Sequence, residues 1–386
     1  MLEAVEWCDY CSIDMEMTGL SKSDRQLASK TKGKLSLDNK VEPRYKDALD
    51  SDGFLVCQFG ISFFKLAGPA NRSLPLKCRA FNMYIMPPKN ARFMVHSWVL
   101  TFLQQNHFDF NEWVRTGVTS LSVPEQKALE AMETVPGPDP YPDDLAEVAA
   151  FFATANAELA QGRPVFMGHL NNWARRLVWK GMREGLAVPV VVDNHMLKPA
   201  SPEEAAAFWE RRDFERSIRG MIGVREVMTA VGASGKPVVT HNGFLDLLFL
   251  LRQFFVGTLP SVYTEYKRLL ADLLPCVVDT KYITANLPVP IRSQLGDAYS
   301  TSIKAHPIDV QWAEGHDRYV NGGHPHEAGY DALMTGLLFA ALKLHNSDPA
   351  MALASCGEVN RVPIYGTVRT YMNLAGEDPV LPDPRD

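Results

Sequence analysis

The sequence is poor in features that would mark a secreted or membrane-bound protein. It has 6 cysteines among 386 residues, too scattered for a disulfide framework, so we expect reduced thiols. Its longest apolar run, residues 332–344, is interrupted by Thr335, Gly336 and Lys343 and is shorter than the ~20 residues that a bilayer span requires. The first ten residues are acidic and lack the basic start of a targeting peptide. We therefore expect a soluble protein of the cytoplasm, the nucleus or both, without a membrane partner.

The chain also lacks an excess of positive charge. Lys and Arg number 39 and Asp and Glu 45, for a net charge of −6, which excludes a globally basic protein that coats nucleic acid. Any polyanion must meet a local basic patch or bound cations. The apolar fraction of 46% can form a hydrophobic core, and the length allows two or three folding units of about 150 residues each.

The first third of the chain predicts a block of strands followed by helices. Strand-forming residues occupy 10–17, 54–65 and 78–86, with the polar residues 21–47 expected to form a loop. Helical spacing runs from Val95 to about Glu133. Its expected core residues are Trp98, Phe102, Trp113 and Val114.

A proline-rich segment, Thr134–Asp144, marks a boundary, because four prolines in eleven residues cannot lie in a helix or a central strand. Helices are expected at 145–159 and 171–183. Beyond Met221, strand PVVT and helix FLDLLFLLRQFF alternate, and a last helix spans 326–344. This alternation predicts an α/β layer fold with a mostly parallel sheet.

Asp14 and Glu16 are two residues apart on a predicted strand, so their side chains leave the same face. Such pairs commonly face solvent on an edge strand. Here the pair interrupts an apolar run and precedes Thr18 and Gly19, where the strand should end. Two like charges on one sheet surface favour a cation between them, so the pair is a candidate metal site.

His241, Asn242 and Asp246 follow the predicted strand PVVT. One interpretation is structural: Asn242 caps the helix, and Asp246 in the first turn benefits from the helix dipole. The other is functional, because ligands bind at the carboxyl ends of strands in open α/β sheets. Asp246 would then face Asp14 and Glu16.

His326 and Asp331 are five residues apart, about 140° around an ideal helix. They can share a pocket only if His326 lies in the incoming loop after Pro325 and the helix begins near Glu327. The spacing alone is common, and a histidine at a helix start is often only structural.

Four carboxylates and one histidine suit two Mg²⁺ ions, with Mn²⁺ as an alternative, better than zinc. Such a centre supports in-line attack on a phosphodiester, and a histidine is a suitable general base near neutral pH. Cys8 and Cys11 form a CxxC, but no second pair completes the four ligands of structural zinc.

The segments SIDMEMTGL, VVTHNGFLDLLFLLRQF, LLPCVVDTKYI and HEAGYDALMTGLLF resemble, in order and spacing, the poly(A)-specific ribonuclease (PARN) family of DEDDh exonucleases. The resemblance covers about nine tenths of the chain. It implies that Asp14, Glu16, Asp246 and Asp331 bind the metal ions and that His326 activates water. Met17 departs from the phenylalanine usual in the family.

The resemblance also implies an RNase H-like α/β fold, with a mixed sheet flanked by helices and a small inserted α+β nucleic-acid-binding module. The expected divisions are 1–141 for the first part of the core, 142–216 for the insert and 217–386 for the second part. No clear Arg-x-x-x-His signature occurs in the insert.

Candidate RNA contacts come from two sources. By resemblance, Lys281 lies near the RNA, and Leu100 and Phe102 line an adenine-binding groove. From the residues themselves, the basic stretch with Arg175 and Arg176, interleaved with tryptophans, is a candidate RNA-facing surface. Its alternative is an ordinary amphipathic helix with a solvated charged face.

The resemblance predicts a Mg²⁺-dependent 3′-to-5′ exoribonuclease that degrades poly(A) tails, releases 5′-AMP and forms a homodimer. A related alternative is a trimmer of small or non-coding RNA ends; the polar C-terminal residues PVLPDPRD favour the deadenylase, because such trimmers often carry an apolar anchor. An inactive RNA-binding scaffold is disfavoured, because clustered acids without a metal are electrostatically costly.

Overall fold

The computed structural model describes residues 1–20, 41–49, 51–68, 73–88, 91–133, 141–289, 291–345, 358–364 and 370–379. The chain divides into two compact units. The first combines Met1–Gln126 with Ile222–Asp386, and the second is Lys127–Met221. The insert expected over residues 142–216 lies within the second unit.

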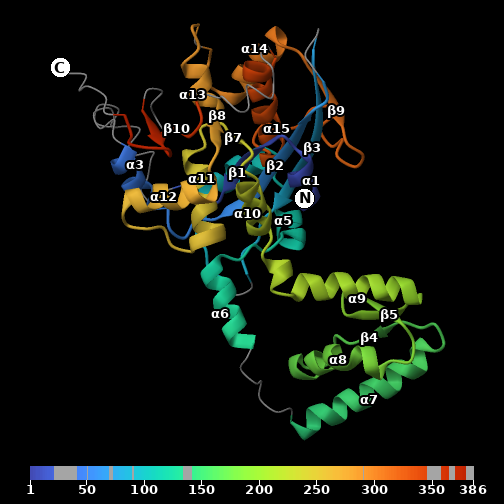
Figure 1. Cartoon of the computed structure of the whole chain (residues 1–386). Coiled ribbons are helices and arrows are strands. Elements are labelled where there is room, and N and C mark those ends of the chain that lie inside the picture. The colour runs from blue at the N-terminus through green and yellow to red at the C-terminus, as the bar shows by residue number, and fades with distance from the viewer. Residues whose placement is uncertain are drawn as a thin grey trace. The chain divides into compact units, whose positions relative to one another are not determined.

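The first unit is built on a six-stranded sheet in the order β8-β7-β1-β2-β3-β9 (Figure 1). β1, β2 and β3 pair antiparallel, whereas β7 and β8 continue the sheet parallel to β1, and β9 pairs parallel to β3. The strands are β1 (Tyr10–Met17), β2 (Val56–Leu66), β3 (Leu74–Tyr84), β7 (Val238–Thr240), β8 (Val277–Asp279) and β9 (Ile308–Trp312). The expected mixed sheet is confirmed, although its centre is antiparallel.

Helices cover both faces of this sheet, and the alternation of β1 decides which residues meet which helices. Ile13 and Met15 belong to the core that also contains residues of α10 (Val224–Ser234), α11 (Phe244–Leu251) and α12 (Tyr263–Leu273). Ser12 faces the other way, toward α15 (Ala328–Phe339), where its hydroxyl donates to the carbonyl of Ala332 at 2.5 Å.

α15 lies unusually close to the sheet because glycines remove the intervening side chains. A Cβ atom placed on Gly60 of β2 would lie 1.9 Å from the carbonyl oxygen of Ala328. A Cβ atom on Gly336 of α15 would lie 2.1 Å from the ring of Phe64. Close approach thus fixes the helix at both its start and its far end.

The remaining elements of the first unit surround this core. The helices are α1 (Leu2–Trp7), α3 (Val41–Leu49), α4 (Ser97–Gln105), α5 (Phe110–Thr116), α6 (Val123–Glu133), which ends in the second unit, α13 (Thr280–Ala285) and α14 (Leu295–Ala305), and the strands are β10 (Arg361–Pro363) and β11 (Tyr371–Asn373). α11 and α15 each continue in a π-helical segment, Arg252–Val256 and Ala340–Leu344.

Two sequence-based expectations are wrong in this unit. The loop predicted over residues 21–47 includes part of α3, whose Val41, Tyr45 and Ala48 are buried; residues 21–40 lie outside the described residues. Trp98 and Val114 were expected in the core but are 49% and 65% exposed. Trp113, by contrast, is buried.

Trp98 is exposed because the short helix α4 buries a different face from the one predicted. Val99 and Leu103, four residues apart, point into a small core with Phe108 and Trp113. Trp98 therefore lies outside this buried face.

The second unit forms its own core from three helices and a small sheet. The helices are α7 (Pro142–Leu159), α8 (Asn172–Gly185) and α9 (Pro202–Arg216), and the strands β4 (Val165–Phe166), β6 (Met196–Pro199) and β5 (Val190–Asp193) pair antiparallel in that order. A capping box between Ser201 and Glu204 begins α9. Apolar residues of α7, α8 and the strands form the core.

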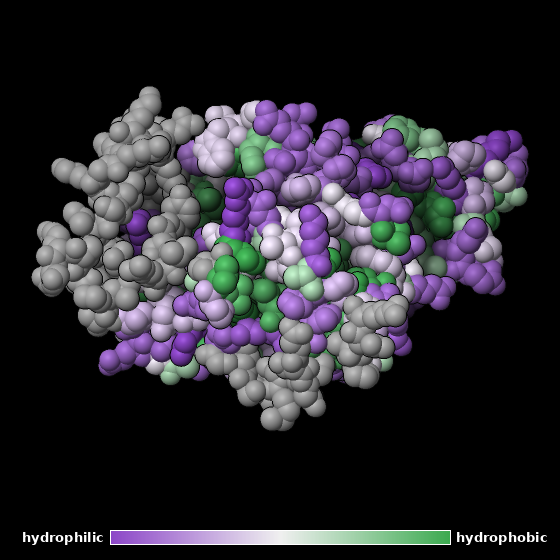
Figure 2. Space-filling model, turned by 90° about the horizontal axis from the view of Figure 1, so that it is seen from above, coloured by the Kyte–Doolittle hydropathy of each residue, from purple (hydrophilic) through white to green (hydrophobic). Residues whose placement is uncertain are grey.

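None of the described helices combines the length and the apolar character needed to cross a membrane. Seen from above, the described surface is mostly hydrophilic, with hydrophobic residues in small groups among the polar ones (Figure 2).

The contact between Gly60 and Ala328 makes a testable prediction. We expect Gly60→Ala to lower the free energy of unfolding by about 1–3 kcal/mol, because the added methyl forces α15 away from β2. Urea denaturation measures this change. The control is Gly296→Ala in α14, where a Cβ atom meets no atom of the described residues within 4 Å; equal stability of the two variants would contradict the proposed close approach.

Candidate active site

Asp14 and Glu16 extend from β1 on the side that faces α15, the side that Ser12 also occupies. In the register of β1 with β2, Asp14 lies opposite Gly60 and Glu16 opposite Gln58. Both acids are partly buried. The expectation that they share one face is confirmed.

Asp246 reaches the same place from the first turn of α11. β7, which precedes this helix, pairs parallel to β1 through Ser12 and Val239. The backbone of Met15, which lies between the two acids of β1, is close enough to favour the charged form of the Asp246 carboxylate. Parallel pairing and this interaction together place Asp246 beside β1.

The turn before α11 is held by a buried carboxylate that the sequence analysis missed. Asp279, at the end of β8, accepts hydrogen bonds from the backbone amides of Asn242 (3.1 Å) and Gly243 (2.8 Å) and from the hydroxyl of Thr240 (2.9 Å). Asn242 does not cap the helix as the structural interpretation expected: its φ is 61°, and Gly243 is the cap residue.

His326 and Asp331 converge because α15 begins after the histidine. Glu327 is the N-cap, so His326 lies in the incoming loop, with φ at 65°. Its backbone amide donates to Oδ2 of Asp331 at 3.1 Å. The loop position that the spacing required for a shared pocket is thus the one observed.

Side chains of the neighbouring strands cap the start of α15. Oε1 of Gln58 on β2 accepts the N–H of Ala328 at 2.8 Å, and Oδ1 of Asn82 on β3 accepts the N–H of Gly329 at 3.0 Å. Asn82 also donates to Glu327, at 3.0 Å. The sheet therefore supplies the caps that the helix lacks locally.

The pKa values of all four acids are raised above their usual values. The pKa of Asp14 is raised well above its usual value by burial and then by the charges of Asp331, Asp246 and Glu16. The pKa of Glu16 is raised by burial, by Asp331 and by Asp246. Burial raises the pKa of both Asp246 and Asp331 to about 7. Full ionisation of this cluster thus requires a compensating positive charge.

Two of the acids and the histidine also lie close enough together to hold a cation. Ligand atoms of Glu16, His326 and Asp331 all lie within 4.8 Å of one another. Oδ1 of Asp331 is buried and has no hydrogen-bond partner among the residues that the structure describes, which is costly unless another group pairs with it. A hard divalent cation bound by carboxylate oxygens fits both observations, and Asp14, Glu16, Asp246 and Asp331 are the candidate ligands.

His326 is the exposed member of the site. Partial burial lowers its pKa, which favours the neutral imidazole that can accept a proton. The ring of Phe102 on α4 lies edge-on to it, with centroids 4.9 Å apart. α4 thus forms the wall next to the candidate base.

The other residues of the first unit that were predicted to contact RNA lie on α13 and α4. Lys281, at the start of α13, donates to Oδ1 of Asn242 at 3.0 Å, and burial lowers its pKa. It therefore adjoins the turn before α11. Leu100 and Phe102 are on α4, where Leu100 is exposed.

Arg175 and Arg176 belong to α8 of the second unit. The guanidinium of Arg175 donates to the carbonyl of Leu170 (3.1 Å) and to Asn172 (3.0 Å). Arg176 is exposed and lies over the ring of Trp173, 5.8 Å from its centroid. Arg176 is thus the better placed of the two for a ligand, and the RNA-binding role of both stays a prediction.

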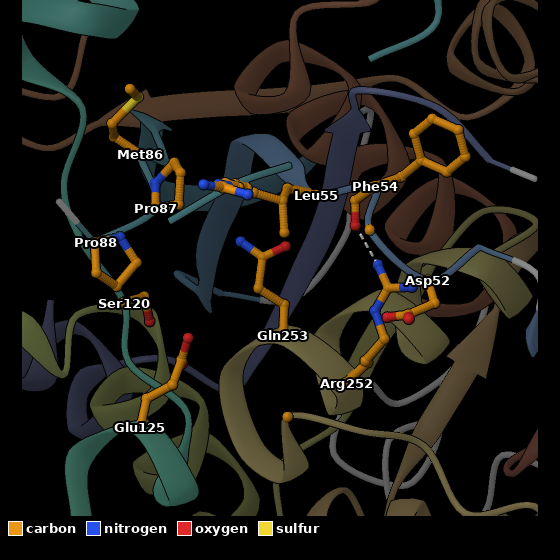
Figure 3. A pocket seen from close by; sticks show the side chains of 13 residues that line it. Asp52, Phe54, Leu55, Met86, Pro87, Pro88, Ser120, Glu125, Arg252 and Gln253 are labelled. Carbon is orange, nitrogen blue, oxygen red and sulfur yellow. Dashed lines mark hydrogen bonds between the residues drawn. The ribbon is translucent and has the colours of Figure 1, made fainter. Parts of the chain in front are cut away.

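A small cavity of about 80 Å³ opens beside His326, with Gln58, Tyr84 and Glu327 among its lining residues. A larger cavity, about 210 Å³, lies near the start of β2 (Figure 3). Its Arg252 donates to backbone carbonyls of Ser51 and Phe54, and its Gln253 accepts the N–H of Val56 at 2.7 Å. These groups hold the fold, so we place the chemistry at the acid cluster.

Four supporting residues escaped the sequence analysis: Gln58, Asn82, Asp279 and Glu327. Gln58 offered a signal, because it is a polar residue in the apolar run FLVCQFGISFFK. Asp279 offered another, as an acid at the end of a predicted strand. Asn82 and Glu327 are unremarkable in sequence, since their roles depend on contacts between distant segments.

Comparison with known proteins identifies relatives over most of the chain. The model of the CAF1 family ribonucleases matches residues 1–339. "Poly(A)-specific ribonuclease PARN" of Xenopus laevis is 26% identical, covering 97% of this chain and 67% of that protein. The human protein of the same name is 24% identical, covering 88% and 59% respectively. Human "Poly(A)-specific ribonuclease PNLDC1" is also 24% identical, covering 77% and 63%. The chain thus spans between 57% and 67% of the length of the PARN relatives.

Similar solved structures include Pop2p of S. pombe in a Mg²⁺- and Mn²⁺-bound form. It is 14% identical, with a TM-score of 0.44, and the match covers 95% of this chain and 93% of that one. The RNase domain of the yeast Pop2 protein is 11% identical, with a TM-score of 0.39.

The raised pKa values predict that the metal-free site destabilises the protein above neutral pH. Asp331, with its pKa at about 7, holds a proton in the folded state that the unfolded chain releases near pH 4, so stability falls as pH rises through this window. In EDTA at pH 8, we expect Asp331→Asn to be more stable than the wild type by about 1–4 kcal/mol. The difference should shrink toward pH 4, and thermal unfolding measures it.

Added Mg²⁺ should stabilise the wild type more than the variant, because it binds only the ionised cluster with full affinity. The exposed Asp309 of β9 supplies the control, since Asp309→Asn should leave both responses unchanged. A variant less stable than the wild type in EDTA at pH 8 would show that Asp331 carries no such electrostatic cost.

Proposed function

The chain belongs to the CAF1 family of ribonucleases, and on this premise we propose that it is a 3′-to-5′ exoribonuclease that shortens poly(A) tails and releases 5′-AMP. The observation that carries the proposal is the convergence of four carboxylates and one histidine from three distant segments. The elevation of the pKa values of these four acids has no structural benefit. It is accounted for by a site that works with bound cations.

The proposed chemistry assigns separate roles to the acids and the histidine. Two Mg²⁺ or Mn²⁺ ions held by the acids would supply charge neutralisation at the phosphate and a water of lowered pKa. His326, neutral because its pKa is lowered, takes the proton of the attacking water. The new bond joins that oxygen to phosphorus. The bond from phosphorus to the 3′ oxygen of the preceding nucleotide breaks with its electron pair on that oxygen, which takes a proton from solvent and leaves a 3′ hydroxyl on the shortened RNA.

The proposed preference for poly(A) is supported by the names of the relatives, poly(A)-specific ribonucleases, and by the wall beside His326. Phe102 and Leu100 on α4 would contact the terminal base, and Lys281 would contact a phosphate. Arg176, exposed on α8 of the second unit, is a separate candidate for contact with RNA phosphates. These roles rest on the position of each residue and its chemical type.

The first test compares homopolymers. With Mg²⁺, we expect 5′-labelled oligo(A) to shorten one nucleotide at a time and faster than 5′-labelled oligo(U), with 5′-AMP as the product. Asp14→Ala should abolish both reactions, because it removes one of the four acids. Equal decay of the two RNAs would refute the preference for poly(A) and leave the nuclease intact. Activity in the variant would refute the assigned centre.

The second test concerns the base. We expect His326→Ala to slow hydrolysis by about 10²- to 10⁴-fold, the usual contribution of a positioned general base, with RNA affinity almost unchanged. Single-turnover rates and filter binding measure the two quantities. His324→Ala, at an exposed histidine two residues earlier, is the control and should retain activity. A His326→Ala protein that loses RNA affinity instead would assign the ring to substrate binding.

A further inference from the structure

Trp98 is an exposed aromatic residue on the wall of the candidate site. The residue is 49% exposed. Exposed tryptophans are uncommon, because the ring contributes a large apolar area. α4 has neither an acidic residue in its first turn nor a basic residue in its last, so its surface suits an uncharged, flat ligand group better than a phosphate.

A ladder of stacked rings holds Trp98 in place. The rings of Phe54 and His96 are stacked with centroids 4.7 Å apart, and His96 stacks on Trp98 at 6.2 Å and 30°. Gly19 packs against this ladder: a Cβ atom there would lie 2.4 Å from the Phe54 ring. The Trp98 ring is therefore preorganised.

The ladder is anchored to the strand that carries two of the acids. The amide of His96 donates to the carbonyl of Thr18 at 3.0 Å, and the hydroxyl of Thr18 donates to the carbonyl of Met94 at 2.7 Å. Thr18 follows directly on β1, two residues after Glu16. The position of Trp98 is thus fixed relative to the acid cluster.

Trp98 also continues the wall that begins at the candidate base. Trp98 and Phe102 are four residues apart on α4, so they lie on one face with Cβ atoms about 5–6 Å apart. The Phe102 ring contacts His326. An aromatic surface thus runs from the candidate base along α4 to the solvent.

We propose that Trp98 is a stacking platform for a base of the RNA whose 3′ end lies at His326. This inference rests on the proposed function and adds a specific affinity determinant to it. Stacking on an aromatic ring is tolerant of base identity, because every base has a π-face. Trp98 therefore strengthens the binding of RNA without selecting adenine.

The test uses the whole protein and steady-state cleavage of oligo(A) with Mg²⁺. We expect Trp98→Ala to raise KM about 5- to 150-fold with kcat nearly unchanged, the range typical of one base–aromatic stack. Trp98→Phe should restore most of the affinity. Trp98→Leu, which keeps apolar volume without an aromatic face, should resemble Trp98→Ala. Val114→Ala, at an apolar residue of α5 that is 65% exposed, is the control and should match the wild type.

An abasic series separates stacking from a structural effect. A ribose without a base is placed at each of the last four 3′ positions in turn, and KM is measured for wild type and Trp98→Ala. We expect one position at which the two proteins become equal, because the base that Trp98 contacts is missing there. A difference that persists at all four positions would overturn the proposal.

Two further outcomes are distinct. If the wild type cleaves no RNA, the proposed function itself fails. If it cleaves RNA and Trp98→Ala has the wild-type KM, only the stacking role fails. Should Trp98→Ala, but not Trp98→Leu, dissociate a dimer in sedimentation velocity without affecting the abasic series, the surface belongs to a contact with a second copy, and the proposal is overturned.

Discussion

The candidate site depends on how the first turn of α15 is tied to the sheet. A helix leaves its first backbone amides without partners inside the helix. In this protein Gln58 and Asn82, from two different strands, accept the hydrogen bonds of the first two such amides. Leaving either amide buried and unpaired costs about 1–3 kcal/mol. α15 therefore cannot shift along the sheet without losing these bonds, and Asp331 stays at a fixed height above β1.

The packing of the elements around the site offsets the electrostatic cost of placing four acids close together. The four carboxylates lie together because stronger interactions fix the elements that carry them. β1 is held by parallel pairing with β7, α11 by burial of its apolar residues, and α15 by its glycine contacts with the sheet. Repulsion among the acids is smaller than the packing energy of these elements, since each buried large apolar side chain contributes about 1.5–3 kcal/mol. The fold thus imposes a charge arrangement that the side chains alone would avoid, as functional sites commonly do.

The sequence predicts those parts of the site that are local in the chain. The two-residue period of a strand puts Asp14 and Glu16 on one face, and the position of Asp246 after a strand implies the edge of the sheet where it lies. The convergence of His326 with Asp331 needed one local condition, a helix that begins after the histidine, and the structure meets it. These inferences succeed because periodicity and strand ends are properties of short segments.

The failures concern residues whose environment is set by distant segments. Trp98 was expected in the core because large aromatic residues are usually buried, but the core next to α4 is filled by Val99 and Leu103. Asn82 shows the converse: a polar residue on a strand gives no signal in the sequence, because its role depends on the contact with α15.

β1 has two roles in the site. Its middle carries Asp14 and Glu16, and the residues just past its end contact the ring ladder. A strand rises about 3.3 Å per residue, so this one rigid segment sets the spacing between the acids and the aromatic wall, and a change in that spacing would require the whole strand to slip in register.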